Sequence, residues 1–510
     1  MDLTPVLEGF QVVLQPQNFL FCLLGVLVGM VIGVLPGLGP AATIAILLPL
    51  TYGMEPVTAI IMLAGIFYGA IYGGTVTAVL LKLPGETSSA ITALDGYPLG
   101  QKGHAGKALG IGAIASFAGG TVSIIALTLV APIIAGWALR FGPPEYAALA
   151  LLGILLVATI SNGTMLKALV AAALGLLLAV VGRDGFTGEQ RYTAGSLELS
   201  DGLQFVPIAM GVFGLAEILY NLEKRHLAQP KPIKVEKVLP TKADMKQSAG
   251  PIARGGVLGF LLGILPGGGA TVSSMVSYGV EKRIARDPKR FGKGAIEGVA
   301  GPETANNAAA TSSFIPLLTL GIPANATMAV MFGALMIQGI APGPQLVNTN
   351  PDLFWGVVNS MYIGNLVLLI LAIPMIGLFV RILYVRTTIL APITLLIVCM
   401  GAFTISNRFF EVMVVIVFGV LGYLMKKFGF DPAPLVLAFV LGSLLEDNFR
   451  RSLMMFQGDL TRVADRPIAL TLLVIFLVVV IIPLVLKLTG RGGKGSLVET
   501  VAGQEPSRTP

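Results

Sequence analysis

The sequence is poor in the residues that build metal centres and disulfides. It has two cysteines and two histidines among 510 residues. Cys22 and Cys399 lie in apolar segments, whereas His104 and His226 lie in polar loops. A disulfide framework and a His/Cys metal site are therefore not expected.

Catalytic signatures and charged surfaces are also lacking. The chain has no Walker-A phosphate loop, no HExxH motif, no nucleophile elbow and no acid pair with a suitable spacing, so we do not predict an enzyme. Only 12% of the residues are charged. The net charge of +7 is concentrated in short stretches beside apolar runs, which is typical of membrane topology and not of nucleic-acid binding.

Long apolar runs dominate the sequence. Hydrophobic residues make up 55% of the chain, and the mean hydropathy is +0.84. The long polar interruptions are 183–202, 223–254 and the tail after Leu488. We predict an all-α polytopic membrane protein with about 10–12 transmembrane segments, because a spanning helix needs about 20 apolar residues. The N-terminus lacks the features of a cleaved signal peptide, so we expect it to be retained.

A glycine pattern occurs twice. The stretch GVLVGMVIGVLPGLG, which starts at Gly25, resembles the stretch from Gly255 to Gly269 in the spacing of its glycines and its proline. LLKLPGETSSA (80–90) resembles LTLGIPANATM (318–328) more weakly. The pattern indicates an internal duplication. We predict these parts: 1–18 N-terminal segment, 19–222 first membrane repeat, 223–254 basic cytoplasmic linker, 255–452 second membrane repeat, 453–489 final loop and transmembrane helix, and 490–510 polar tail.

Loop charges predict the orientation of the spans. The linker after Tyr220 carries seven basic residues between Lys224 and Lys246, so it should be cytoplasmic. Counting spans from there places the C-terminus in the cytoplasm and the N-terminus in the periplasm. Span 105–139 then starts inside and its counterpart 353–380 starts outside, which predicts two inverted-topology repeats. Four arginines fall on the outer side against this rule: Arg450, Arg451, Arg462 and Arg466.

Each repeat contains a break inside an apolar run. Residues 255–280 lie between two basic stretches, so this segment should enter and leave the membrane on one side. It is predicted to be a re-entrant helix-break-helix hairpin around PGGGAT, and 19–53 is predicted to be its counterpart around PGLGP. Broken backbone at membrane depth is tolerated where protein or a water-filled cavity satisfies its polar groups, so the breaks should face a site.

The breaks and nearby polar residues are the candidate ligands. The glycine ladders themselves are interpreted as close helix contacts. Hydroxyls that follow the breaks either cap the next half-helix or bind a ligand. In GPETANNAAATSS (301–313), Glu303 near an interface and Asn306 and Asn307 as ligands are the two interpretations. The substrate-binding candidates are Pro36, Gly37, Gly39, Thr43, Pro266, Gly267, Gly269, Thr271, Ser273, Asn306, Asn307, Pro323, Asn325 and Thr327. The ion-binding candidates are Tyr72, Gly74, Thr75, Thr87, Ser88 and Ser312.

Several motifs together resemble one family. They include GVLPGLGPAATIAILLP, LLKLPGETSSAITALDGYPLGQKG, PETANNAA and LVLAFVLGSLLEDNFRRSL. This fingerprint is similar to the large membrane subunit (TctA-like) of the tripartite tricarboxylate transporters, from about Phe19 to Leu453. The resemblance implies a secondary active importer of small organic carboxylates in the bacterial inner membrane, coupled to sodium or protons.

The resemblance also implies partners. A small membrane subunit (TctB-like) and a periplasmic solute-binding protein (TctC-like) are expected, together with an organic carboxylate substrate. No cofactor is expected beyond a coupling sodium ion, and no nucleic acid. The alternative is an autonomous ion-coupled carrier or exchanger that needs no binding protein.

Overall fold

The chain folds into a bundle of helices in a computed structural model. The structure describes residues 4–35, 38–83, 85–161, 164–223, 233–235, 238–265, 267, 269–383 and 387–488. The α-helices of the first half are α1 (Thr4–Leu14), α2 (Pro16–Gly33), α3 (Pro40–Leu47), α4 (Pro56–Leu81), α5 (Ser89–Leu99), α6 (Ala105–Ala138), α7 (Pro143–Ile160), α8 (Met165–Ala179), α9 (Phe205–Ala209) and α10 (Ala216–Glu223).

The second half is also helical. Its α-helices are α11 (Lys242–Ile264), α12 (Gly269–Ile284), α13 (Glu297–Ser312), α14 (Phe314–Leu320), α15 (Ala326–Ile337), α16 (Leu346–Thr349), α17 (Pro351–Ala372), α18 (Ile376–Ile382), α19 (Thr387–Ser406), α20 (Phe409–Lys427), α21 (Ala433–Met455) and α22 (Pro467–Leu488). Short 3-10 or π turns are η1 (Leu48–Thr51), η2 (Gly100–His104), η3 (Met210–Leu215), η5 (Pro288–Arg290) and η6 (Leu460–Asp465). The strands β1 (Gly182–Arg183) and β2 (Gln190–Arg191) form a small antiparallel pair.

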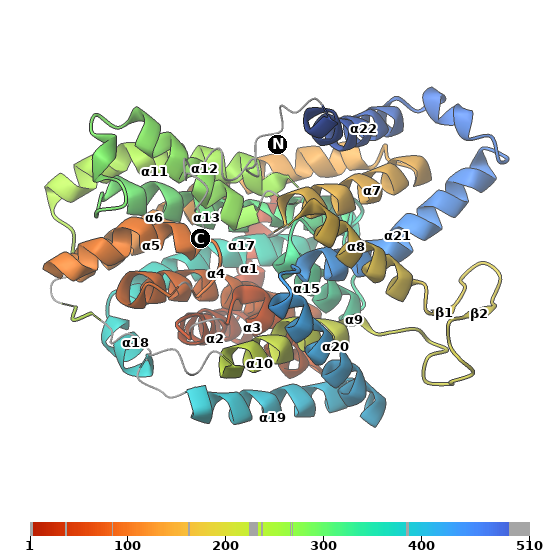
Figure 1. The fold of residues 1–510 in the computed structure, drawn as a ribbon, viewed down its shortest axis with the longest axis horizontal. Coiled ribbons are helices and arrows are strands. Elements are labelled where there is room, and N and C mark those ends of the chain that lie inside the picture. The colour runs from red at the N-terminus through yellow and green to blue at the C-terminus, as the bar shows by residue number, and fades with distance from the viewer. Residues whose placement is uncertain are drawn as a thin grey trace.

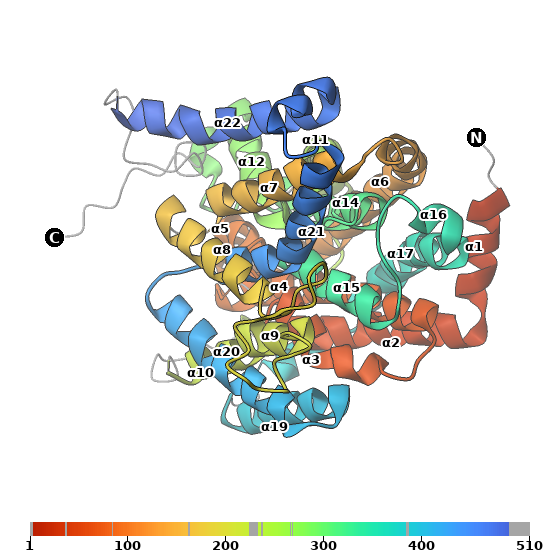
Figure 2. The ribbon, with the colours of Figure 1, turned by 90° about the vertical axis from the view of Figure 1, so that its right-hand side faces the viewer.

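The helices point in several directions: α19 runs roughly horizontally in Figure 1, whereas α22 runs roughly horizontally in Figure 2, which is turned by 90°. Helix α4 lies in the middle of the molecule in Figures 1 and 2, and all but its first two residues are buried. Six helical segments among the described residues are long and apolar enough to cross a membrane. Seven shorter apolar helices accompany them. The predicted all-α polytopic membrane protein is confirmed.

The glycine ladders are helix contacts. In both halves a side-chain carbon on a ladder glycine would overlap backbone of the facing helix, so only glycine allows the approach. The facing residues are Met62, Ile66 and Ala70 of α4 for Gly25, Gly29 and Gly33, and Gly301, Ala305 and Ala309 of α13 for Gly255, Gly259 and Gly263. The contacts advance in the same order along both partners, so α2 is parallel to α4, and α11 is parallel to α13.

Parallel neighbours require that the segment between them runs back. Helix α3 therefore returns alongside α2, and α12 returns alongside α11. The ion pair between Arg254 of α11 and Glu281 of α12, with Nη2 and Oε2 2.6 Å apart, ties the two arms of the second hairpin together. The course of the chain agrees with the predicted helix-break-helix hairpins.

The two halves meet through α4 and α13. Thr75 of α4 contacts Glu303 of α13, and Phe67 of α4 packs on Phe314 of α14, which directly continues α13, with ring centroids 5.9 Å apart. As residue numbers rise along α4 they fall along α13, so these equivalent helices run antiparallel. The inverted repeat as a whole stays a prediction. The antiparallel course of α4 and α13 is what such a repeat requires of these two helices.

Candidate functional site

Four helix breaks lie next to one another in the bundle, and Thr87 in the second break is exposed. They are the segments between α2 and α3, between α4 and α5, between α11 and α12, and between α14 and α15. In the second half, the Gly267 N–H donates to the carbonyl oxygen of Ala324 at 2.8 Å. Gly267 has φ of +81°, a conformation that favours glycine.

The breaks of the two halves also touch. The Thr87 and Thr271 hydroxyl oxygens are 2.7 Å apart, and Ser274 Oγ donates to the Ser88 carbonyl oxygen at 3.1 Å. In the first half, a side-chain carbon on Gly39 would lie 3.9 Å from Glu86 Cβ. All four breaks are therefore linked by contacts, and Glu86 lies where the first two breaks meet.

The helix starts at these breaks differ in capping. Helices α3 and α5 begin without a side-chain cap. Helix α15 is capped, because Asn325 Oδ1 accepts from the Met328 N–H at 3.0 Å. Uncapped N-terminal N–H groups carry partial positive charge and attract anions. The predicted ligand Asn325 is thus a helix cap in this structure.

The hydroxyls that follow the breaks donate to carbonyl oxygens earlier in the chain. Thr43 Oγ1 donates to the Gly39 carbonyl oxygen at 3.0 Å, and Ser273 Oγ donates to the Gly269 carbonyl oxygen at 2.8 Å. Each hydroxyl bonds the carbonyl four residues earlier, so neither caps its helix through an N–H group. Their lone pairs stay available to a ligand.

A buried polar cluster surrounds Glu303 of α13, whose side chain is fully buried. Its carboxylate accepts from four neutral donors, and a carboxylate has about four acceptor positions. The donors are Thr75 Oγ1 (2.7 Å), Ser116 Oγ (3.0 Å) and Asn307 Nδ2 (3.2 Å) to Oε1, and Thr92 Oγ1 (3.0 Å) to Oε2. Glu303 thus joins α4, α5, α6 and α13.

Glu303 of the GPETANN segment is buried inside the bundle and not on its surface, whereas the role of Asn306 and Asn307 as ligands stays a prediction. Asn306 and Asn307 are both buried, and Asn306 Nδ2 has no hydrogen-bond partner in the described part of the chain. The Tyr72 hydroxyl is also buried and has no partner among the described residues. Asn306 and Tyr72 are thus two predicted ligands with a polar atom free for binding.

The other candidates are spread more widely. Gly74 lies against Glu86, which brings it to the junction of the breaks. Ser312 packs beside Gly263 where α13 contacts α11. Its hydroxyl donates to the Ala309 carbonyl oxygen of its own helix at 3.3 Å. Pro323 is buried in the fourth break and Thr327 is half-buried in the first turn of α15. Pro36, Gly37 and Pro266 lie outside the described residues.

Sequence reasoning missed three polar residues as site members: Thr92, Ser116 and Glu303. A signal existed for Glu303, since it precedes Asn307 by one helical turn and shares its face. Thr92 and Ser116 belong to other helices, and nothing in their own segments distinguishes them. Their role follows only from packing.

An ion-pair network holds the β1–β2 hairpin against α21 at the edge of the bundle (Figure 1). Arg450 Nη1 is 2.8 Å from Asp184 Oδ2, and Arg191 Nη1 is 2.7 Å from Glu446 Oε1. Backbone N–H groups of Thr187 and Phe186, with the Arg450 guanidinium, lower the pKa of Asp184 to about 2. Two of the four arginines that oppose the charge rule are paired with acids: Arg450 here, and Arg466, whose Nη1 lies 3.9 Å from Glu145 Oε1.

These features define a class: a polytopic α-helical membrane protein built around discontinuous helices, an architecture used by secondary transporters. The chain belongs to the tripartite tricarboxylate transporter TctA family, whose model matches residues 19–437. It is accordingly a multi-pass membrane component of a transport system. The family name places it in a system of three parts.

Two relatives come from Agrobacterium vitis. An uncharacterized 52.8 kDa protein in the TAR-I ttuC' 3' region is 48% identical over 495 residues, which cover 97% of this chain and 99% of the relative. An uncharacterized protein in the TAR-II ttuC' 3' region is 52% identical over 226 residues, which cover 44% of this chain and 93% of the relative. No solved structure matches the chain.

Proposed function

We propose that this chain is the large membrane subunit of a secondary active importer of small organic carboxylates, of the tricarboxylate or dicarboxylate class. It works in the inner membrane with a small membrane subunit and a periplasmic solute-binding protein. The observation that carries the proposal is the junction of four helix breaks from two halves of the chain. Family membership supports the substrate class and the partners.

The junction suits a carboxylate. The uncapped starts of α3 and α5 supply N–H groups, and each helix N-terminus contributes roughly half an elementary charge. Hydroxyls of Thr87 and Thr271 supply further donors. Such a site binds an anion without a cluster of arginines in the membrane interior.

The acidic residues near the junction support coupling of transport to a cation. Glu86 lies at the junction against Gly74, and the next residue of α4, Thr75, donates to the buried Glu303. A carboxylate substrate beside these two acids is repelled unless a cation accompanies it. A sodium ion or a proton that enters with the substrate removes this repulsion, so transport of one requires the other.

The division of the four breaks between the two halves supports alternating access. The first two breaks belong to one half and the last two to the other, and they touch through Thr87 and Thr271. Movement of one half against the other would open the junction to each side of the membrane in turn. Substrate and cation together neutralise the site and permit this movement.

The test is uptake of radiolabelled di- and tricarboxylates into vesicles that hold this chain, with and without its partners, under a sodium or a pH gradient. Accumulation that requires a gradient and the binding protein is expected. Accumulation without the binding protein would favour the autonomous carrier, and the absence of uptake under every gradient would contradict both.

Two substitutions bear on the site. Asn306→Ala and Gly267→Leu are expected to abolish uptake while the protein still inserts, because one removes a free buried amide and the other strains a backbone at φ of +81°. Normal uptake in both variants would refute the site. Membrane insertion is measured in parallel by the yield of monodisperse protein after purification.

A further inference from the structure

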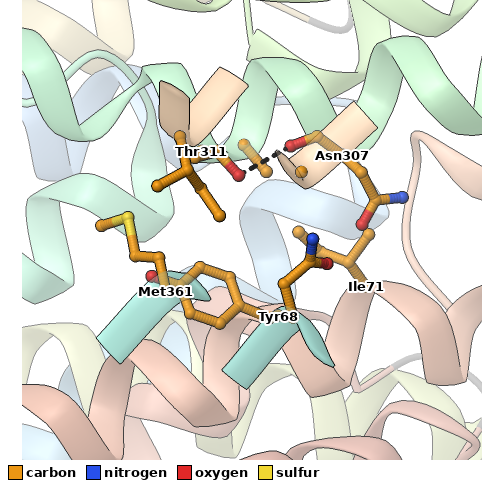
Figure 3. Close-up of a pocket in the computed structure, with 9 residues that line it drawn as sticks. Tyr68, Ile71, Asn307, Thr311 and Met361 are labelled. Carbon is orange, nitrogen blue, oxygen red and sulfur yellow. Dashed lines mark hydrogen bonds between the residues drawn. The ribbon is translucent and has the colours of Figure 1, made fainter. Parts of the chain in front are cut away.

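A small, partly open cavity of about 10 Å³ lies where the two halves of the chain pack, and none of its lining residues belongs to the four breaks. Helices α4, α6, α13 and α17 form its wall (Figure 3). This volume is about that of one water molecule or one bare monovalent cation. It is far too small for a carboxylate substrate.

Four of the buried residues that line this space carry a side-chain oxygen: Tyr68, Asn307, Thr311 and Asn365. The Tyr68 hydroxyl is buried and has no hydrogen-bond partner among the described residues. Thr311 Oγ1 donates to the Asn307 carbonyl oxygen at 3.0 Å, which leaves its lone pairs free. Figure 3 shows Tyr68, Asn307 and Thr311 around the cavity.

Hydrogen bonds orient the two amides. Asn307 Nδ2 donates to Ser116 Oγ at 3.0 Å and to Glu303 Oε1 at 3.2 Å, so the amide oxygen is the end of this side chain left for the cavity. Asn365 Nδ2 donates to the Phe117 carbonyl oxygen at 2.8 Å and to Thr121 Oγ1 at 3.0 Å, with the same consequence. Both amides present oxygen because their nitrogens are held elsewhere.

Glycine makes room for this arrangement. A side-chain carbon at Gly120 of α6 would lie 2.8 Å from both Asn365 amide atoms, Oδ1 and Nδ2. Such a contact would force the amide to move. The cavity wall is therefore shaped around the Asn365 side chain.

Charge favours a cation over water. Asn307 connects the cavity directly to Glu303, whose four hydrogen-bond donors are all uncharged. No ion pair involving Glu303 occurs in the described part of the chain. A carboxylate in such surroundings is stabilised by a nearby positive charge. Four neutral oxygens beside a carboxylate are the ligands that a hard monovalent cation prefers.

We infer that this cavity binds one sodium ion, held by the side-chain oxygens of Tyr68, Asn307, Thr311 and Asn365 and placed between the two halves of the chain. The inference deepens the proposed function, since it rests on ion-coupled transport and gives the coupling ion a site. This site differs from the ion-binding set expected from the sequence, of which Tyr72 is the nearest member on α4. Because the ion bridges α4 and α13, its occupancy would favour one arrangement of the two halves.

The test uses sodium alone with the full chain in lipid nanodiscs. Thermal unfolding is followed while sodium chloride replaces choline chloride at constant ionic strength. A saturable rise in melting temperature with sodium is expected, because a ligand that binds the folded state stabilises it. Equal melting temperatures in sodium and choline would overturn the inference and leave only a water in the cavity.

Tyr68→Phe is the sharpest variant. It removes a hydroxyl that has no protein partner, so the melting temperature in choline should stay the same or rise. The sodium concentration for half-maximal stabilisation should increase about tenfold, which corresponds to the loss of one good ligand. Asn365→Ala should weaken the sodium response in the same way.

Asn359→Ala is the matched control on α17. Asn359 is a buried asparagine that donates to the Val6 carbonyl oxygen, away from the cavity, so this variant should keep the sodium response even where it is less stable. If Tyr72→Phe lost the rise in melting temperature with sodium while Tyr68→Phe kept it, the ion would bind at the residues expected from the sequence. That result would overturn the inference.

The two proposals fail separately. If the sodium response depends on Tyr68 and Asn365 but uptake is not driven by sodium, the ion site stands and sodium coupling fails. If uptake is driven by sodium while both variants respond normally, coupling stands and this site is wrong.

Discussion

Glu303 shows how one buried acid organises the centre of the bundle. Its oxygens accept four hydrogen bonds from residues of four helices. A buried carboxylate without such donors would be strongly unfavourable. The hydroxyls of Thr75, Thr92 and Ser116 therefore donate to Glu303. This bonding limits their ability to bind an ion as well.

Glu303→Gln tests whether this carboxylate is charged. The amide keeps the shape but replaces charge-assisted hydrogen bonds with neutral ones, so we expect a loss of about 2 kcal/mol in the free energy of unfolding. Equilibrium unfolding of the purified chain measures it. Glu297→Gln is the control, since that acid pairs with Arg290 near the surface and its exposed ion pair should matter by less than about 1 kcal/mol. An unchanged stability in Glu303→Gln would mean that the native carboxyl is already protonated.

Asp184 gives a pH dependence at the edge of the bundle. N–H groups of Thr187 and Phe186 and the Arg450 guanidinium lower its pKa from 3.8 to about 2. Because the folded pKa is the lower one, its stabilisation of the hairpin is complete above pH 3.8 and is lost as the pH falls through about 2.

A spin label at Glu189→Cys, with Cys22 and Cys399 replaced, reports the order of this hairpin. Its mobility should increase as the pH falls from about 4 to about 2. In Asp184→Asn the label should already be mobile at neutral pH and show no such transition. The same acid transition in both proteins would assign it to another group.

Residue roles divide into those a sequence can predict and those it cannot. The breaks and the asparagine pair were predictable because a proline–glycine run or adjacent amides are out of place in apolar segments. The partners of Glu303 were not, because Thr92 and Ser116 become its ligands only when α5 and α6 pack on α13. The asparagine pair was found, but the acid one turn earlier was not distinguished from an interface residue.

At the scale of elements, glycine spacing sets how closely helices pack. Each ladder glycine lies against backbone of the facing helix, so the ladders fix both the distance and the register of α2 on α4 and of α11 on α13. The same contacts make these helices parallel and force α3 and α12 to run back. Loop charges and helix breaks predict the hairpins. The close contacts of the ladder glycines explain why the chain has to turn back.

Gly29→Ala tests the ladder against a matched change. The new carbon would overlap the Ile66 carbonyl oxygen, so we expect a loss of about 2–3 kcal/mol in stability. Gly136→Ala on α6 is the same substitution where no atom lies within 4 Å, and it should be neutral or stabilising by up to about 1 kcal/mol. Equilibrium unfolding compares the two, and equal effects would show that the ladder does not limit the approach of α2 to α4.

At the scale of the whole molecule, the proposed transport depends on the contact between the halves. Helices α4 and α13 cross antiparallel, and the α4–α5 break meets the start of α12 through Thr87 and Thr271. Sequence comparison of the halves suggested a duplication but could not give this contact, because it joins residues that are not equivalent in the two repeats. The proposed alternating access requires the contact to break and reform.

A reversible cross-link at this contact tests the movement. The Thr87 and Thr271 hydroxyls are 2.7 Å apart, so cysteines at both positions, in a chain lacking Cys22 and Cys399, should form a disulfide on oxidation. Uptake should fall at least about tenfold in the oxidised protein and recover on reduction, because a covalent bond holds the halves in one arrangement. Each single-cysteine variant, treated with the same oxidant, should retain the uptake it has when reduced. Full uptake by completely cross-linked protein would show that the halves do not separate here, and movement would then have to occur within one half, by the hairpin of α11 and α12 shifting against α13.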